Sequence, residues 1–136
     1  VKVLLNTRVQ NIDAEGVHID GKIILSHNVI WSAGVSANPF TSKLETELDK
    51  SGRVIVDSYC AIPNKKDVFA IGDMACFMDS KTNSALPGVS PVAMQQGRFV
   101  ADLIINEVKG KKREKSFYYT NKGIMATIGR QDAVGE

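Results

Sequence analysis

The chain has 136 residues, a length at which one domain is the default and a hydrophobic core can form. Apolar residues make up 43% and charged residues 24%, which excludes disordered, collagen-like and coiled-coil proteins. The net charge of +2 is too small to predict a nucleic-acid partner. No apolar run reaches the roughly 20 residues that cross a bilayer, so we expect this stretch of protein to be soluble.

The first third of the chain is expected to be rich in strands. Asp20-Gly21 joins two apolar runs, residues 17–19 and 22–25, which is a strong signal for a β-hairpin. Residues 3–5 and 7–12 predict one or two further strands before it. Residues 29–34 are a short apolar run that ends in small residues, as a buried strand does where it meets a ligand or a tight turn.

The middle of the chain changes character. Residues 35–52 are rich in polar residues and are expected to form a crossover, with a short amphipathic piece at 42–48. A strand is predicted at 53–57, followed by a turn-rich approach around Pro63-Asn64. Residues 68–73 then form an apolar run that predicts a buried strand ending at Gly-Asp.

The longest helix is predicted from Pro91 to Val108, with Ser90 as the N-cap and Lys109-Gly110 as the stop. An apolar stripe would run along it through Phe99, Val100, Leu103, Ile104 and Val108. Two last strands are expected at residues 117–119 and 124–128.

A run of basic residues follows the helix, comprising Lys109, Lys111, Lys112, Arg113 and Lys115. It is typical of a solvated loop, with contact to an anionic membrane as the alternative.

The Gly72-Asp73 pair is the sharpest functional signal. A parallel strand delivers its last residues to the sheet edge where cofactors bind, and glycine lets the backbone approach a ligand. An ionised carboxylate only accepts hydrogen bonds, so Asp73 suits the hydroxyl groups of a ribose or ribityl chain. A strand-end turn or a helix cap is the structural alternative.

Gln95 and Gln96 are unusual in an apolar helix. They point about 100° apart, so they cannot have the same role. One of them is expected to be buried or to face a pocket, and simple solvent exposure is the alternative for the other.

Several kinds of chemistry find no support in the sequence. No GxGxxG motif is present, and no serine or cysteine has a recognisable base, so we assign no catalytic residue. Cys60 and Cys76 form no CxxC motif, which predicts buried, reduced thiols. His18 and His27 are expected at the surface, and we assign no metal site.

Four blocks in this order resemble the carboxyl-terminal part of the type II NADH:quinone oxidoreductases: VIWSAG at 29–34, VFAIGD at 68–73, LPGVSPVAMQQGR at 86–98 and KGIMATIGR at 122–130. The Gly-Asp block is shared by the wider superfamily of flavoproteins with two dinucleotide-binding domains. The Gln-Gln-Gly and Met-Ala-Thr-Ile-Gly blocks are more specific to the type II enzymes.

The resemblance implies an α/β fold of the FAD/NAD(P)-binding, Rossmann-like type, of which this chain would be a piece. Residues 1–34 would end an inserted NADH-binding domain, 35–52 would be a crossover, and 53–136 would form the second half of an FAD-binding domain. A piece would also account for the start without Met and the missing GxGxxG motifs.

The resemblance also implies roles for individual residues. Asp73 would bind the ribityl chain of FAD, Gly72 would lie on its phosphate side, and the helix start at Val92 and Ala93 would meet the flavin. Ala33 and Gly34 would also contact a cofactor. The residues near the quinone entrance would be Gln95, Gln96, Met125 and Ala126.

By the same resemblance, the whole protein would transfer electrons from NADH through FAD to a membrane quinone without pumping protons. It would be a peripheral homodimer on the cytoplasmic face of the membrane. The alternatives are another flavoprotein reductase of this fold, of the ferredoxin or disulfide type, or a piece that by itself is only a binding or assembly module.

Overall fold

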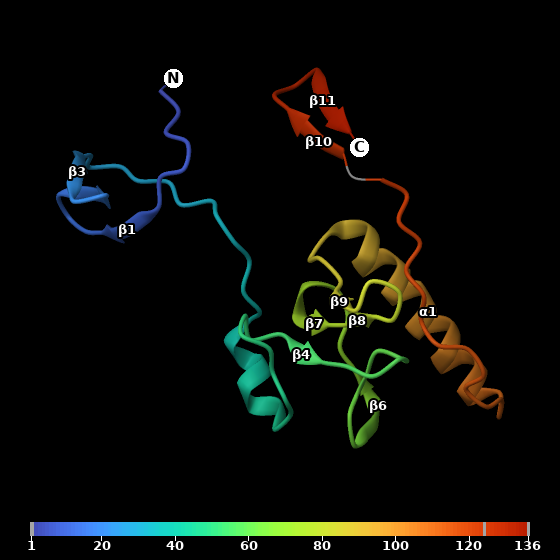
Figure 1. Cartoon of the computed structure of the whole chain (residues 1–136). Coiled ribbons are helices and arrows are strands. Elements are labelled where there is room, and N and C mark those ends of the chain that lie inside the picture. The colour runs from blue at the N-terminus through green and yellow to red at the C-terminus, as the bar shows by residue number, and fades with distance from the viewer. Residues whose placement is uncertain (1, 124, 136) are drawn as a thin grey trace. The chain divides into compact units, whose positions relative to one another are not determined.

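The computed structural model describes residues 2–123 and 125–135, and it divides into two compact units, Val1–Gly34 and Val35–Glu136 (Figure 1). We call them unit 1 and unit 2. No helix among the described residues has the length and apolar character needed to cross a bilayer.

Unit 1 contains one antiparallel sheet, in the order β1, β2, β3, with bounds Val9–Ile12, Gly16–Ile19 and Lys22–Leu25. The predicted hairpin is confirmed, because Ile19 pairs with Lys22 across Asp20 and Gly21. Both turn residues have positive φ, 45° and 73°, which matches the twist of the strands they join. Before the hairpin, one of the one or two expected strands is present as Val9–Ile12, and residues 3–5 do not form a strand.

Residues 29–34 do not form the buried strand that their composition predicted. They have no regular structure, and Ile30 is 93% exposed. A parallel strand is buried only when neighbouring strands flank it, and no described residue pairs with this segment. The apolar run alone did not supply those neighbours.

The secondary structure of unit 2 consists of one long helix and short elements. They are η1 Pro39–Leu44, β4 Val54–Ile55, β5 Ala61–Ile62, β6 Lys65–Phe69, η2 Gly72–Met74, β7 Ala75–Cys76, β8 Met78–Asp79, β9 Ser84–Ala85, α1 Ser90–Val108, β10 Met125–Ile128 and β11 Asp132–Gly135. Among the described residues, β4 and β7 are the pair that runs parallel, and the other paired strands are antiparallel.

The strand predicted at 68–73 is displaced. β6 ends at Phe69 and pairs antiparallel with β5 across the Pro63-Asn64 turn, where Asn64 has φ 65°. Val68 and Ile71 are exposed, so the run is not a buried parallel strand. The turn just before β6 offers a nearby partner, and the parallel strand β7 begins only after the Gly-Asp pair.

The long helix is confirmed, with α1 spanning Ser90–Val108 and Gly110 at φ 75° after its end. Its N-cap is Val89 rather than Ser90, and no side chain caps it. The predicted apolar stripe is partly wrong, because Ile104 and Val108 are exposed. The buried positions instead follow the line Val92, Gln96, Val100 and Leu103.

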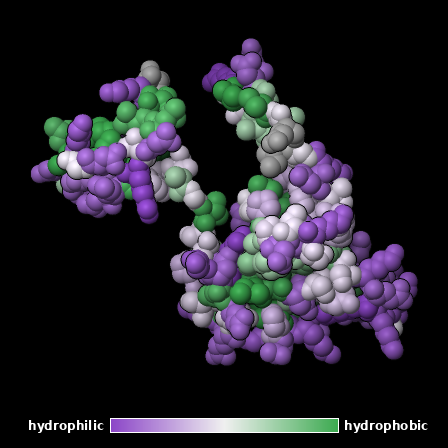
Figure 2. All heavy atoms as spheres, in the orientation of Figure 1, coloured by the Kyte–Doolittle hydropathy of each residue, from purple (hydrophilic) through white to green (hydrophobic). Residues whose placement is uncertain are grey.

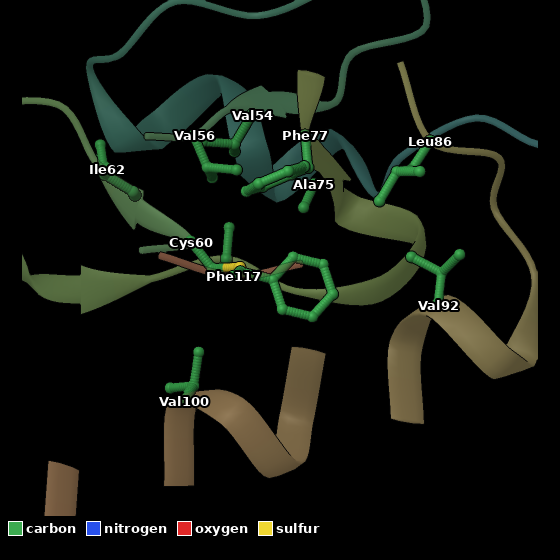
Figure 3. Packing of buried hydrophobic residues seen from close by; sticks show 11 residues of the cluster. Val54, Val56, Cys60, Ile62, Ala75, Phe77, Leu86, Val92, Val100 and Phe117 are labelled. Atoms are coloured by element: carbon green, nitrogen blue, oxygen red, sulfur yellow. The ribbon is translucent and has the colours of Figure 1, made fainter. Parts of the chain in front are cut away.

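The core of unit 2 lies between the short strands and α1. Figure 3 shows Val92 and Val100 pointing from the helix toward Cys60 and Phe117. The Phe117 ring contacts Phe77 edge-on, with 5.1 Å between centroids. Phe117 also donates its backbone N–H to Ser58 O at 2.8 Å. Phe117 therefore joins the core and Tyr119 packs against it, but residues 117–119 do not form the predicted strand.

The second predicted C-terminal strand is confirmed at Met125–Ile128, while Ile124 lies outside the described residues. β10 pairs with β11 across the Gly129-Arg130 turn, because a local hairpin brings its two strands together within a few residues.

The basic run is exposed at its four lysines, and Arg113 is the exception. The Arg113 side chain pairs with Glu107 at 2.5 Å and donates to Lys66 O at 2.7 Å, and its guanidinium carbon lies 5.3 Å from the centre of the Phe69 ring. One arginine therefore fixes a loop whose lysines face solvent.

Candidate functional site

The Gly72-Asp73 turn lies in η2, directly before β7, and packs against the first turns of α1. Gly72 has φ 63°, and a Cβ placed on it would lie 3.2 Å from the Cβ of Ala93. Glycine is therefore required both by the left-handed backbone and by the close approach of the helix.

Gln96 fixes this turn from the second turn of the helix. Its side chain is 1% exposed, and its Oε1 accepts a hydrogen bond from the backbone N–H of Gly72 at 2.7 Å. A buried amide is costly unless it is hydrogen-bonded, so this contact accounts for a polar residue on the apolar line of α1. The prediction that one glutamine is buried is confirmed.

Asp73 is exposed, and within the described residues its carboxylate has no hydrogen-bond or ion-pair partner. Gly88 approaches it so closely that a Cβ at position 88 would lie 3.3 Å from Asp73 Oδ1. The carboxylate is thus held beside the loop that enters α1 while its oxygens remain available as acceptors.

The start of α1 has fewer groups available to bind a ligand than the sequence suggested. The Val92 side chain lies in the core, so only its backbone could contact a ligand. The N–H groups of Val92 and Ala93 both donate to Val89 O, at 3.0 and 3.2 Å. The positive end of the helix dipole remains as a favourable environment for an electron-rich group.

These features fit one part of an FAD molecule better than another. An exposed carboxylate acceptor beside two closely packed glycines suits the hydroxyl groups of a ribityl chain. The Gly72 N–H is already bound to Gln96, so it is not free to hold a phosphate. Gly72 can contribute on the phosphate side only by allowing close approach.

Gln95 makes a different contact from its neighbour. Its Nε2 donates to Thr120 O and its Oε1 accepts from Thr120 N, both at 3.0 Å. This reciprocal pair ties α1 to the segment that leads toward β10. The two glutamines make separate contacts, in line with their different directions on the helix, and both amides contact backbone.

The remaining predicted site residues belong to other segments of the chain. Met125 and Ala126 are exposed in the β10–β11 hairpin. Ala33 and Gly34 end unit 1 and are exposed in a segment without regular structure.

Two residues at the site were not singled out from the sequence. Gly88 packs on Asp73, and the Pro87-Gly88 turn signal could have suggested a close backbone approach. Thr120 binds Gln95 through its backbone atoms, so no side-chain pattern could have found it.

The two cysteines are free and buried, as predicted. Burial raises the pKa of the Cys60 thiol to about 12, and burial also raises the pKa of Cys76. Neither thiol is a ready nucleophile in the folded chain. Among the residues with described positions, no three His, Cys, Asp or Glu side chains cluster as a metal site would require.

Comparison with known proteins identifies the class to which these features belong. The family model described as pyridine nucleotide-disulphide oxidoreductase matches residues 1–97. That match spans the hairpin sheet, the Gly-Asp turn and the first turns of α1, and it supports the expected FAD/NAD-binding, Rossmann-like class.

Individual proteins that are similar to this chain support the same class. The type II NADH:quinone oxidoreductase NdhA of Mycobacterium tuberculosis is 34% identical over 149 aligned positions, which cover 100% of this chain and 30% of that protein. An internal alternative NAD(P)H-ubiquinone oxidoreductase A1 of Arabidopsis thaliana is 33% identical and matches 85% of this chain and 24% of its own length. A type II NADH:quinone oxidoreductase of Staphylococcus haemolyticus is 33% identical, with coverages of 78% and 26%.

The chain thus spans less than a third of these relatives, 24% to 30% of their lengths. The alignment with the Mycobacterium tuberculosis protein covers the whole of this chain, so it includes the four sequence blocks on which the resemblance is based. The chain belongs to the pyridine nucleotide-disulphide oxidoreductase family, and within that family it resembles the type II NADH:quinone oxidoreductases.

Proposed function

We propose that this chain is part of an FAD-dependent enzyme that transfers electrons from NADH to a membrane quinone without pumping protons. The observation that carries the proposal is the Gly72-Asp73 turn, held against the start of α1 with the Asp73 carboxylate free to accept. The relatives are quinone oxidoreductases that use NADH or NAD(P)H, which supports the proposed direction of electron flow.

FAD, when bound, would supply the redox chemistry by taking a hydride from NADH and passing electrons to the quinone. The residues of this chain would orient it. Asp73 would accept hydrogen bonds from the ribityl hydroxyls, and Gly72 and Gly88 would leave room for close approach. Ala93, at the positive end of α1, would lie at the flavin ring.

On the quinone side we propose Gln95, Met125 and Ala126, whereas Gln96, which the resemblance also assigned to that side, is buried and bound to Gly72. The Gln95–Thr120 pair supports a common location for the first turns of α1 and the segment leading to Met125. The exposed Met125 side chain offers apolar surface to a hydrophobic substrate.

The domain assignment remains part of the proposal. Residues 1–34 would end an NADH-binding domain that also contributes Ala33 and Gly34, 35–52 would be a crossover, and 53–136 would complete an FAD-binding domain. The whole protein would act as a homodimer at the cytoplasmic face of a membrane, bound peripherally.

A disulfide substrate is the less favoured alternative, although the family description includes such enzymes. Dithiol chemistry requires an accessible thiolate, and both cysteines here are buried. The pKa of Cys60, raised to about 12, keeps that thiol protonated at neutral pH. No residue of the site discriminates between a ferredoxin and a quinone as the electron acceptor. Assays with a panel of acceptors would show which of the two the protein reduces.

The test uses the whole protein, purified with its flavin. We expect Asp73→Ala to weaken FAD binding about 10- to 100-fold, because it removes a charged acceptor. Asp102→Ala is the matched control, since Asp102 is an exposed aspartate on α1. The readouts are the flavin-to-protein ratio and NADH oxidation with a soluble quinone, a ferredoxin or a disulfide.

A protein that keeps stoichiometric FAD after Asp73→Ala would refute the placement of the cofactor. Turnover with ferredoxin or a disulfide in place of quinone would refute the proposed acceptor. An intact protein that binds neither FAD nor NADH would favour the binding or assembly module.

A further inference from the structure

The contact between Gln96 and Gly72 joins two segments that are 24 residues apart in the chain. On one side is the middle of a long, well-formed helix. On the other is a short 3-10 turn, η2, whose N-cap residue Ile71 makes no side-chain capping bond. Within the described chain, the side-chain hydrogen bond to the first residue of this turn is therefore the one that Gln96 accepts from the Gly72 N–H.

Gly72 is held in three ways by the same stretch of α1. Gln96 accepts its N–H, Ala93 blocks any side chain at its Cα, and Gly97 lies against the preceding Ile71, where an added Cβ would be 3.8 Å from its Cδ1. The hydrogen bond is the directional contact among them, because van der Waals contacts limit position without fixing the plane of a peptide. Asp73 is the next residue along the chain.

We propose that Gln96 is a positioning residue that orients the Ile71–Gly72 peptide, and through it the Gly72-Asp73 turn, for FAD, and that it does not itself bind FAD or quinone. The inference rests on the FAD site proposed above. It revises the quinone-side role suggested for Gln96 by the resemblance, because Oε1 is bound to Gly72 and the side chain is buried. Gln95, on the adjoining face, keeps its place on the quinone side.

The chemistry of the side chain explains why glutamine stands at this position. An aliphatic residue would pack well between Val92 and Val100, which flank it on the buried line of the helix. It would leave the Gly72 N–H without its acceptor in a half-buried turn, and the Ile71–Gly72 peptide would lose the hydrogen bond that fixes its plane. Glutamate has the same length and keeps an oxygen at the same place, whereas methionine has similar length and no such acceptor.

The experiment compares variants of the whole protein by FAD titration and by thermal unfolding of the flavin-free form. We expect Gln96→Met to raise the FAD dissociation constant about tenfold, the usual effect of one lost buried hydrogen bond. Gln96→Glu keeps the acceptor, so its FAD affinity should stay within about threefold of the wild type, although the buried carboxyl group should lower the unfolding temperature. Gln96→Asn keeps an amide but is shorter by one methylene, so it should also weaken binding and provides a milder test if Gln96→Met does not fold.

Val100→Ala is the control for a purely structural effect, because Val100 lies on the same buried line and does not contact Gly72. We expect it to lower the unfolding temperature without changing FAD affinity. The inference is overturned if Gln96→Met or Gln96→Asn lowers stability and leaves FAD affinity intact, or if Val100→Ala weakens FAD binding equally.

Asp73→Ala separates this inference from the proposed function. If Asp73→Ala weakens FAD binding and the Gln96 variants do not, only the positioning role is wrong. If FAD binding survives in Asp73→Ala as well, the cofactor site itself is wrong.

Discussion

Unit 1 and unit 2 use the same local turns and hairpins but bury very different amounts of apolar surface. Every buried hydrophobic side chain among the described residues lies in unit 2, from Val54 to Phe117. In unit 1 the apolar residues of β3 are exposed, and Figure 2 shows hydrophobic side chains on the surface of that unit. Well-formed hairpin geometry therefore does not by itself provide a core.

The difference has a physical cause. A three-stranded sheet is stable when one of its faces is covered, and the burial of apolar area is the main favourable contribution to folding. Unit 2 has a helix that covers its strands, while the described part of unit 1 consists of strands and irregular segments alone. We expect the stability of unit 2 to depend on packing and that of unit 1 to depend on backbone geometry.

The strongest test of this contrast removes apolar contacts from each unit. Phe117→Ala should lower the free energy of unfolding by about 3 to 5 kcal/mol, because it leaves a cavity between Phe77 and Phe99. Ile24→Ala in unit 1 should cost less than about 1 kcal/mol, since Ile24 is 44% exposed and its removal leaves no closed cavity. Urea unfolding measures both, with the helical circular dichroism signal and alkylation of Cys60 reporting on unit 2 and the amide NMR signals of β2 and β3 reporting on unit 1.

Equal losses in the two variants would contradict the contrast. Cys60 is a suitable reporter because burial raises its pKa to about 12, so the thiol reacts only when the core opens.

A second test changes the backbone of unit 1. A Cβ at position 16 would lie 2.1 Å from Ile24 O, and Gly16 has φ 149°. Gly16→Ala should therefore cost about 2 to 3 kcal/mol and separate β2 from β3. Two-dimensional NMR should show loss of the sheet signals of unit 1 while the signals of α1 stay unchanged.

Gly21→Ala is the matched control, because Gly21 also has positive φ and has open space around it. Its expected cost of about 1 kcal/mol arises from the left-handed backbone alone. If the two variants perturb the sheet equally, the close approach of β3 to Gly16 is not what limits this position.

The smallest expected effect concerns one aspartate in each unit. Asp49 accepts from the N–H groups of Ser51 and Arg53 and from Arg53 Nε at 2.7 Å. Burial alone would raise its pKa, but these hydrogen bonds outweigh it and lower the pKa below the ordinary value of 3.8. Asp13 makes a similar set of contacts in unit 1, where it is more exposed.

Because the folded-state pKa of Asp49 is lowered, its stabilising contribution is present above pH 3.8 and is lost as the pH falls through the folded pKa. We expect Asp49→Asn to cost about 1 kcal/mol at pH 7 and to reduce the acid sensitivity of unit 2 below pH 3.8. Asp13→Asn should have a smaller effect. Unfolding followed across pH 2 to 7 checks both, and unchanged acid sensitivity in Asp49→Asn would contradict the assignment.

Features that depend on neighbours in the sequence were predictable. Asp20 and Gly21 determine a two-residue turn through their own dihedral preferences, and the flanking apolar runs have only each other within reach. The bounds of α1 follow in the same way from Pro91 near its start and Gly110 after its end. The Gly-Asp pair could likewise be recognised as a candidate site, because its signal is contained in two adjacent residues.

Features that depend on distant partners were decided by the tertiary structure. Residues 29–34 and 68–73 are both apolar, but composition cannot specify whether a neighbouring strand exists to bury them. Gln96 meets Gly72 across 24 residues, and Gln95 meets Thr120 across 25. The acceptors and donors on the far side are backbone groups that every residue carries, so only packing selects which of them a buried glutamine will bind.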